Sequence, residues 1–284
     1  MARSGSPGHV FGLFWFALLT ACASGDVAVV LPPQVDPALT LDFTQYSSTA
    51  ALQSAITGGT PPWLVLDNEI NQISLVTGLG SAPSVNNNRF MRYTWPGNNS
   101  GAQDYTIRAI IRDLPPGGEF WIEVWSRFSA GWRNGPSGGS LYDYKYMIIL
   151  NSGGSRFNVQ MLGQGGSNTQ WGYPGNESAW TSSGNGSLGF LSGGPIDMSV
   201  YWDGNWHRFR YHLKLSASSS DPTGIATWYI DDRLVHRGTG LQTTPGSGFA
   251  EFNFGANMNN AVDQVQTLDW AALRIYTENP RWGF

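Results

Sequence analysis

Two neighbouring segments decide the fold: residues 203–216, DGNWHRFRYHLKLS, and residues 225–237, IATWYIDDRLVHR. In the first segment, Phe209, Tyr211 and Leu213 alternate with charged or polar residues. A period of two is typical of a β-strand with one face toward a core and the other toward solvent. We therefore expect an antiparallel pair of half-buried strands here.

The second segment divides into two strands, predicted over residues 225–231 and 233–237, around Asp231 and Asp232. Two-residue hairpin turns place their central residues at positive φ and usually contain glycine. Because no glycine is present, we expect a longer turn or a turn of another type.

The same alternation continues outward in both directions, between clusters of Gly, Ser and Asn. It predicts strands over residues 39–43, 63–66, 72–76, 89–95, 105–112, 119–128, 144–150, 156–162, 197–202, 206–215, 249–254 and 268–276. No helical run intervenes and no repeat is visible, so we expect two packed antiparallel sheets. The longest predicted loop, residues 163–195, is expected to border a binding surface, because loops of this length are usually functional or disordered.

The composition excludes several classes of protein. The 284 residues include 36 Gly, 16 Pro and 13 Trp, and only 13% are charged. Many aromatic residues argue against disorder. A net charge of −4 without a long basic run argues against nucleic-acid binding. A single cysteine excludes a disulfide scaffold.

The N-terminus reads as a targeting signal over residues 1–21. It ends in Leu19-Thr20-Ala21-Cys22, which resembles the bacterial lipobox, and Cys22 is the chain's only cysteine. The resemblance implies a diacylglycerol on Cys22 and, since no Asp follows it, an outer-membrane lipoprotein of a Gram-negative-type bacterium, on either face of that membrane. An ordinary signal with a chance Cys is the alternative. We expect a tether over residues 22–38 and one domain over 39–284.

Three elements together resemble a known superfamily: Gly204-Asn205-Trp206-His207 opening a strand, Trp228 and Asp231 in the following hairpin, and Asp269 in the last strand. They look like concanavalin A-like lectin/glucanase jelly rolls, closest to the polysaccharide-lyase and laminin-G-like branches. The resemblance implies an all-β, two-sheet antiparallel jelly-roll sandwich with a concave sheet that serves as a groove for polysaccharide.

Residues 119–128 offer a candidate groove face. Trp121 and Trp125 alternate with an apolar set and share their face with Glu123 and Arg127. Aromatic planes pack on sugar rings, while carboxylate and guanidinium groups bind hydroxyls. We therefore predict a polysaccharide-binding surface at these four residues. The alternative is that both tryptophans are buried and that the charged residues pair with one another.

A lyase needs a group that neutralises a uronate carboxylate, a base and an acid. By resemblance, lyases of this superfamily use Arg, Gln or Asn for the first role and His or Tyr for the others, although no lyase motif is matched whole. The candidate catalytic residues are Arg92, Tyr144, Tyr146, Gln160 and His212. Arg156 and Asn158, on the same strand face as Gln160, are candidates for substrate binding.

Other functions stay open from the sequence. A non-catalytic carbohydrate-binding lipoprotein fits the many tryptophans, and a structural or adhesion module fits the missing motif. Hydrolysis by Glu119 and Glu123 would need paired carboxyls, but Trp121 stands where related glucanases have a third carboxylate. The sequence identifies no cofactor with certainty. A structural Ca²⁺ is compatible with the superfamily, with Asp42 and Asp269 as candidate ligands.

Overall fold

A computed structural model of the chain describes residues 35–41, 43–59, 63–64, 70–78, 89–97, 103–104, 107–114, 117–133, 142–151, 156–163, 170–176, 180–181, 196–215, 217, 221, 223–243, 249–258 and 262–282. All of them belong to one compact unit, Gln34–Phe284. The predicted signal and Cys22 lie outside the described residues. No helix in the described ranges has the length and hydropathy needed to cross a bilayer.

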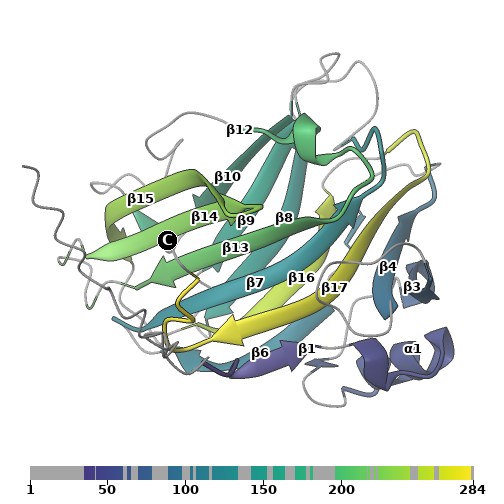
Figure 1. Ribbon diagram of the computed structural model, residues 1–284, viewed down its shortest axis with the longest axis horizontal. Helices are drawn as coiled ribbons and strands as arrows, with labels where there is room; N and C mark the ends of the chain where they lie inside the picture. The colour runs from purple at the N-terminus through teal and green to yellow at the C-terminus, as the bar shows by residue number, and fades with distance from the viewer. Residues whose placement is uncertain are drawn as a thin grey trace, which may run out of the picture. The chain divides into compact units, whose positions relative to one another are not determined.

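The described strands form two antiparallel sheets (Figure 1). The first sheet has the order β11-β15-β14-β13-β7-β17-β4-β3, and β1 also pairs with β17. Its strands are β1 (Leu39–Leu41), β3 (Ile73–Thr77), β4 (Arg89–Trp95), β7 (Glu119–Phe128), β11 (Trp180–Thr181), β13 (His207–Lys214), β14 (Gly224–Ile230), β15 (Arg233–Thr243) and β17 (Gln266–Tyr276).

The second sheet lies behind the first in the view of Figure 1. Its order is β12-β10-β9-β8-β16-β6-β2, and β5 also pairs with β16. Its strands are β2 (Trp63–Leu64), β5 (Gln103–Asp104), β6 (Ile107–Leu114), β8 (Tyr142–Asn151), β9 (Arg156–Gly163), β10 (Gln170–Asn176), β12 (Ile196–Asp197) and β16 (Phe249–Met258). The predicted all-β, two-sheet jelly-roll sandwich is therefore confirmed.

Aromatic rings from both sheets fill the space between them. Tyr146 of β8 stacks on Trp270 of β17, with ring centroids 4.9 Å apart. On β7, the predicted core face is confirmed, since all five of its residues are buried: Phe120, Ile122, Val124, Ser126 and Phe128. A large aromatic side chain buries about 150–250 Å², so this layer of rings excludes water from the space between the sheets.

The prediction that no helix interrupts the strands is wrong, because α1 spans Thr49–Thr57. Ser48 caps it, since its Oγ accepts a hydrogen bond from the Ala51 backbone N–H at 3.1 Å. The helix buries Leu52 and Ile56, which are four residues apart. Two further short helices, the 3-10 turns η1 (Phe43–Gln45) and η2 (Ile70–Gln72), flank it in sequence.

Two other predictions also fail locally. Residues 163–195 are not one continuous loop, because they contain β10 and β11. The strand predicted over residues 197–202 is mostly the 3-10 helix η4 (Met198–Tyr201), which buries Met198. Glycine, asparagine and proline in β10 lower its strand propensity, and this explains why alternation did not reveal it.

The hairpin between β14 and β15 has a two-residue turn after all. Ile230 pairs directly with Arg233, and both intervening residues have positive φ, 50° at Asp231 and 65° at Asp232. The expectation of a longer or different turn was wrong because Asp tolerates the left-handed region better than most residues. The Asp231 carboxylate also accepts a hydrogen bond from the Arg208 backbone N–H at 2.9 Å, which helps to offset the strain.

Gly97 provides a test of this packing. Its φ is +74°, and an added Cβ would overlap the backbone of Gln264 and Val265. Gly131 has a similar φ of +71° but open space around its Cα. We expect Gly131→Ala to lower the free energy of unfolding by about 1 kcal/mol and Gly97→Ala by about 3 kcal/mol. Chemical denaturation checks this, and equal losses in the two variants would contradict the close approach.

Candidate functional site

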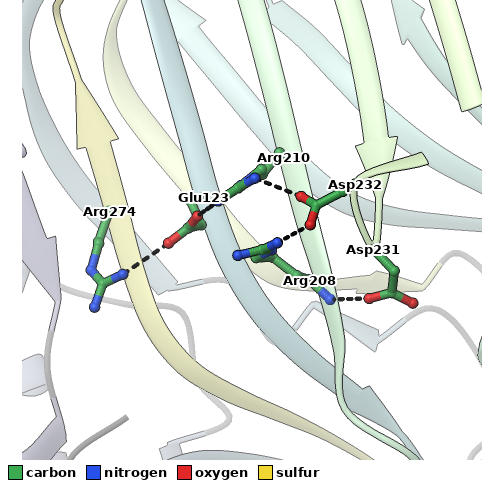
Figure 2. A network of polar contacts seen from close by, with 6 residues as sticks. All are labelled: Glu123, Arg208, Arg210, Asp231, Asp232 and Arg274. Atoms are coloured by element: carbon green, nitrogen blue, oxygen red, sulfur yellow. Dashed lines mark hydrogen bonds and ion pairs between the residues drawn. The ribbon is translucent and has the colours of Figure 1, made fainter. Parts of the chain in front are cut away.

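The outer face of the first sheet carries a chain of ion pairs that includes Glu123 (Figure 2). Register places Arg210 of β13 and Arg274 of β17 on either side of Glu123. Arg210 Nη2 lies 2.7 Å from Glu123 Oε2, and Arg274 Nη1 lies 2.8 Å from Oε1. Glu123 is only 5% exposed. Its carboxylate therefore has both oxygens occupied by neighbours in the same sheet.

The network continues into the β14–β15 turn. Arg210 Nη1 donates to Asp232 Oδ1 at 2.6 Å, and Arg208 also pairs with Asp232. Figure 2 shows these contacts running in one line from Arg274 through Glu123 to the turn. Three strands, β17, β7 and β13, and the β14–β15 turn are thereby joined across the outer face by charge-assisted hydrogen bonds.

Trp121 and Trp125 are covered by their neighbours on this face. His212 stacks on Trp121, with ring centroids 4.8 Å apart and planes 1° from parallel. Arg208 lies over Trp125 at 5.4 Å. The exposed fractions of the two tryptophans are 9% and 8%. The prediction that Trp121, Glu123 and Trp125 form a sugar-binding surface is therefore wrong, because neither indole plane nor the carboxylate is open to a ligand.

Arg92 and Arg127 both bind Asp269, which is 1% exposed. Arg92 Nε lies 2.6 Å from Asp269 Oδ1, and Arg127 Nη2 lies 2.6 Å from Oδ2. Arg127 is also stacked between Phe90 and Trp206, at 5.2 and 4.9 Å. Both guanidinium groups neutralise this buried carboxylate, and the roles of Arg92 in catalysis and of Arg127 in substrate binding stay predictions.

The same ion pairs bear on the prediction that Asp269 is a calcium ligand. With two arginines on its oxygens, Asp269 does not fit a cation site. Asp42 lies outside the described residues. Within the described ranges, no group of three or more His, Cys, Asp and Glu residues is arranged to hold a metal.

His212 also belongs to this outer face. Burial lowers the pKa of His212 and outweighs the opposing hydrogen bond with Glu119, whose Oε1 lies 2.5 Å from His212 Nε2. The imidazole is in the first sheet, whereas Gln160 is in the second. The structure does not bring these two predicted catalytic residues together.

Tyr144 and Tyr146 lie inside the sandwich, and both are 0% exposed. Burial raises the pKa of both phenols well above the usual value, with a smaller opposing effect of Ser126 on Tyr146. A phenol that is buried in this way contacts no polymer and does not ionise near neutral pH. The prediction that they are catalytic is wrong, because their strand turns that face toward the core.

The outer face of the second sheet differs in the residues that register brings together. Tyr173 of β10 pairs with Gln160 of β9, Gln160 with Lys145 of β8, and Lys145 with Asn257 of β16. Directly opposed residues of antiparallel strands share a face. Since Tyr144, next to Lys145, is on the core side, this polar row occupies the other face. We call it the Lys145 row.

A second row lies beside the first. Asn158 of β9 is opposite Ile148, which is opposite Asn253 of β16, and Asn253 is opposite Arg108 of β6. One step further, Arg156 is opposite Leu150. Arg156, Asn158 and Gln160 thus occupy alternate positions of β9, on the same side as Lys145. Their roles stay a prediction.

The sequence analysis missed Lys145, Tyr173, Asn253 and Asn257. A signal for Lys145 was present, since the chain contains only two lysines, Lys145 and Lys214. Lys145 stands between Tyr144 and Tyr146, in a strand that also contains Asp143 and Asn151.

No protein-family model and no curated protein sequence matches the chain. Among solved structures, alginate lyase Aly36B is similar, with a TM-score of 0.53, 13% identity and coverage of 85% of this chain and 97% of that one. Endo-β-1,4-glucuronan lyase from the fungus Trichoderma reesei has a TM-score of 0.49, 17% identity and coverage of 77% and 92%.

The Bacillus licheniformis β-glucanase is more distant, with a TM-score of 0.39, 12% identity and coverage of 77% and 100%. At such low identity these similarities show the fold alone. The fold is the concanavalin A-like jelly roll, as the motifs over residues 203–276 implied.

The Glu123 network predicts a large effect on stability. Glu123→Gln removes the charge that compensates the nearly buried Arg210, and we expect the free energy of unfolding to fall by about 3 kcal/mol. Glu119→Gln, at a partly exposed pair on the same strand, should cost less than about 1 kcal/mol. Urea denaturation of both variants tests this. A Glu123→Gln variant with an unchanged free energy of unfolding would show that the network contributes nothing to stability.

His207 adds a pH dependence at the start of β13. Its Nδ1 lies 2.7 Å from Asp231 Oδ2, and its Nε2 lies 3.1 Å from Asp203 Oδ1. Burial acts to lower the pKa of His207, but the hydrogen bonds with both carboxylates outweigh it and raise the pKa. A raised folded-state pKa stabilises the protein below the unfolded value, about 6.5, and this contribution disappears as the pH rises through the folded value.

We therefore expect His207→Gln to lower the free energy of unfolding by about 1 kcal/mol at a pH below the unfolded-state pKa and by less in alkaline solution. Denaturation of the variant and the wild type across this range gives the difference. A difference that is independent of pH would contradict the protonated state of His207.

Proposed function

We propose that this protein is a polysaccharide lyase that cleaves a uronic-acid polymer by β-elimination on the outer face of its second sheet. The observation that carries the proposal is the Lys145 row, in which register brings a lysine, a tyrosine and two amide residues together across adjacent strands, with Asp104 of β5 next in line opposite Asn257. Its architecture is also that of an alginate lyase, although similarity of fold does not by itself define an activity.

β-Elimination needs the groups that this row contains. A base removes the C5 proton of a uronate, a double bond forms between C4 and C5, and the C4–O bond breaks. The departing oxygen then takes a proton, and the uronate carboxylate must be neutralised for C5 to become acidic. Lys145 and Tyr173 can exchange protons, while Gln160 and Asn257 can donate hydrogen bonds to the carboxylate.

The spacing within the row suits one sugar unit. Lys145 and Tyr173 are separated by one intervening strand, so their backbones lie roughly 10 Å apart. A separation of this size is enough for one sugar ring between the two positions. Arg108 and Arg156, at neighbouring register positions on the same face, would add cationic character for a polyanion, which Glu251, opposite Leu150 in the row of Arg156, offsets in part.

The lysine pair in the chain gives a matched test of activity. We expect Lys145→Ala and Tyr173→Phe each to lower formation of the unsaturated product by at least about a hundredfold. Lys214→Ala, on β13 of the other sheet, should leave it unchanged. The measurement is the ultraviolet absorbance of the conjugated uronate, with the full-length chain and a panel of alginates, glucuronans and pectates.

Two results would count against this function. Equal losses in Lys145→Ala and Lys214→Ala would remove Lys145 from the reaction. Binding of a uronic-acid polymer by the wild type, detected by tryptophan fluorescence, without any product would indicate a non-catalytic carbohydrate-binding protein. Attachment to a membrane through Cys22 stays a prediction from the sequence.

A further inference from the structure

Strand β8 changes register immediately after Lys145. Residues 142–145 pair in regular order with 163–160 of β9, and pairing resumes with Met147 opposite Val159. Tyr146 is therefore an extra residue on β8. On the other side of the strand, β16 also shifts register, between Phe254 and Asn257. The Lys145 row thus lies at the edge of a β-bulge, a feature that is common beside active sites because it redirects side chains.

The bulge decides which residues of β8 reach the core. Tyr146 and Met147 are consecutive, and both belong to the same buried core cluster, as expected where an extra residue interrupts the alternation of faces. If the extra residue were lost by a slip of one position, residues 142–145 would exchange faces. Tyr144 would then move to the outer side and Lys145 to the core. The position of Lys145 opposite Gln160 and Asn257 therefore requires the bulge to be fixed.

Tyr146 is fixed from the opposite sheet. Its hydroxyl lies 2.5 Å from Ser126 Oγ on β7, and its ring is within 4.9 Å of Trp270 and 5.3 Å of Phe209. Ser126 is 0% exposed and is the one polar residue on the core face of β7. A buried hydrogen bond of this kind is satisfied in only one register, because a slip would leave two unpaired hydroxyls in an apolar layer.

We propose that Tyr146 is a positioning residue, and that its hydrogen bond to Ser126 across the sandwich locks the β8 bulge and holds Lys145 on the outer face. The catalytic consequence rests on the lyase function proposed above. The control of Lys145 by the Ser126–Tyr146 bond does not depend on that function, so the two can be tested apart.

The two lysines allow a direct test by nuclear magnetic resonance. Reductive methylation of the full-length chain with ¹³C-formaldehyde labels Lys145, Lys214 and the N-terminal amine, and Lys145→Arg and Lys214→Arg assign the two lysine signals. We expect Tyr146→Phe and Ser126→Ala each to shift or broaden the Lys145 signal and to leave the Lys214 signal in place. Circular dichroism confirms that each variant is folded.

Tyr211→Phe is the matched control. Tyr211 is 1% exposed in the same core, and its hydroxyl has no hydrogen-bond partner among the described residues. Its removal should leave both lysine signals unchanged. A Lys145 signal in Ser126→Ala that coincides with the wild type overturns the proposal. If Tyr146→Phe does not fold, Ser126→Ala alone decides.

Kinetics give a second, separate arm. Since misplacement of a reacting group by about 1 Å can cost roughly a hundredfold in rate, we expect Ser126→Ala to lower kcat by at least about tenfold, with KM changed by less than about twofold. A kcat equal to that of Tyr211→Phe overturns the catalytic consequence. If the wild type shows no lyase activity, the proposed function fails, and the resonance experiment still decides the role of Tyr146.

Discussion

Contact between the two sheets through aromatic rings is the constraint on which the rest of the structure depends. Tyr146 and Trp270 meet from opposite sheets, and Phe209 packs beside them. Every strand that contributes to this layer must turn one face inward, so only its outward-facing positions remain available to contact a ligand. The core also contains the buried Ser126–Tyr146 hydrogen bond, which adds a directional requirement that apolar packing alone lacks.

The two outer faces use charge in different ways. On the first sheet, Glu123 and Asp269 each take two arginine partners, so these two carboxylates and the four guanidinium groups are paired with one another. On the second sheet, register places Gln160 and Asn257 directly opposite Lys145, and Asp104 of β5 follows opposite Asn257. A face whose charges are already paired stabilises the sandwich, whereas a cation among amides is suited to an anionic ligand.

Alternation with a period of two was enough to predict most strands, because a residue's neighbours along the chain decide which face it shares. It could not decide which strands become neighbours. Trp121, Glu123 and Trp125 have the composition of a sugar-binding surface, and only the pairing with Arg210 and His212 shows that the surface is closed. Tyr144 and Tyr146 were predicted to be catalytic because a phenol can act as an acid or a base. Their rings are also apolar enough to belong to the core, and the structure buries both of them, with Lys145 between them in sequence.

The bulge in β8 shows why part of the site could not be read from the sequence at all. Strict alternation places Tyr146 and Met147 on opposite faces, yet both are buried. The extra residue of β8 accounts for their place in one core cluster, and the proposed lock on it is a hydroxyl 20 residues earlier in the chain, on Ser126 of β7. The position of Lys145 is thus determined by tertiary contact rather than by local pattern. The paired charges that join β13, β7 and β17 stabilise the sheet to which Ser126 belongs, so stability on one side of the sandwich supports geometry on the other.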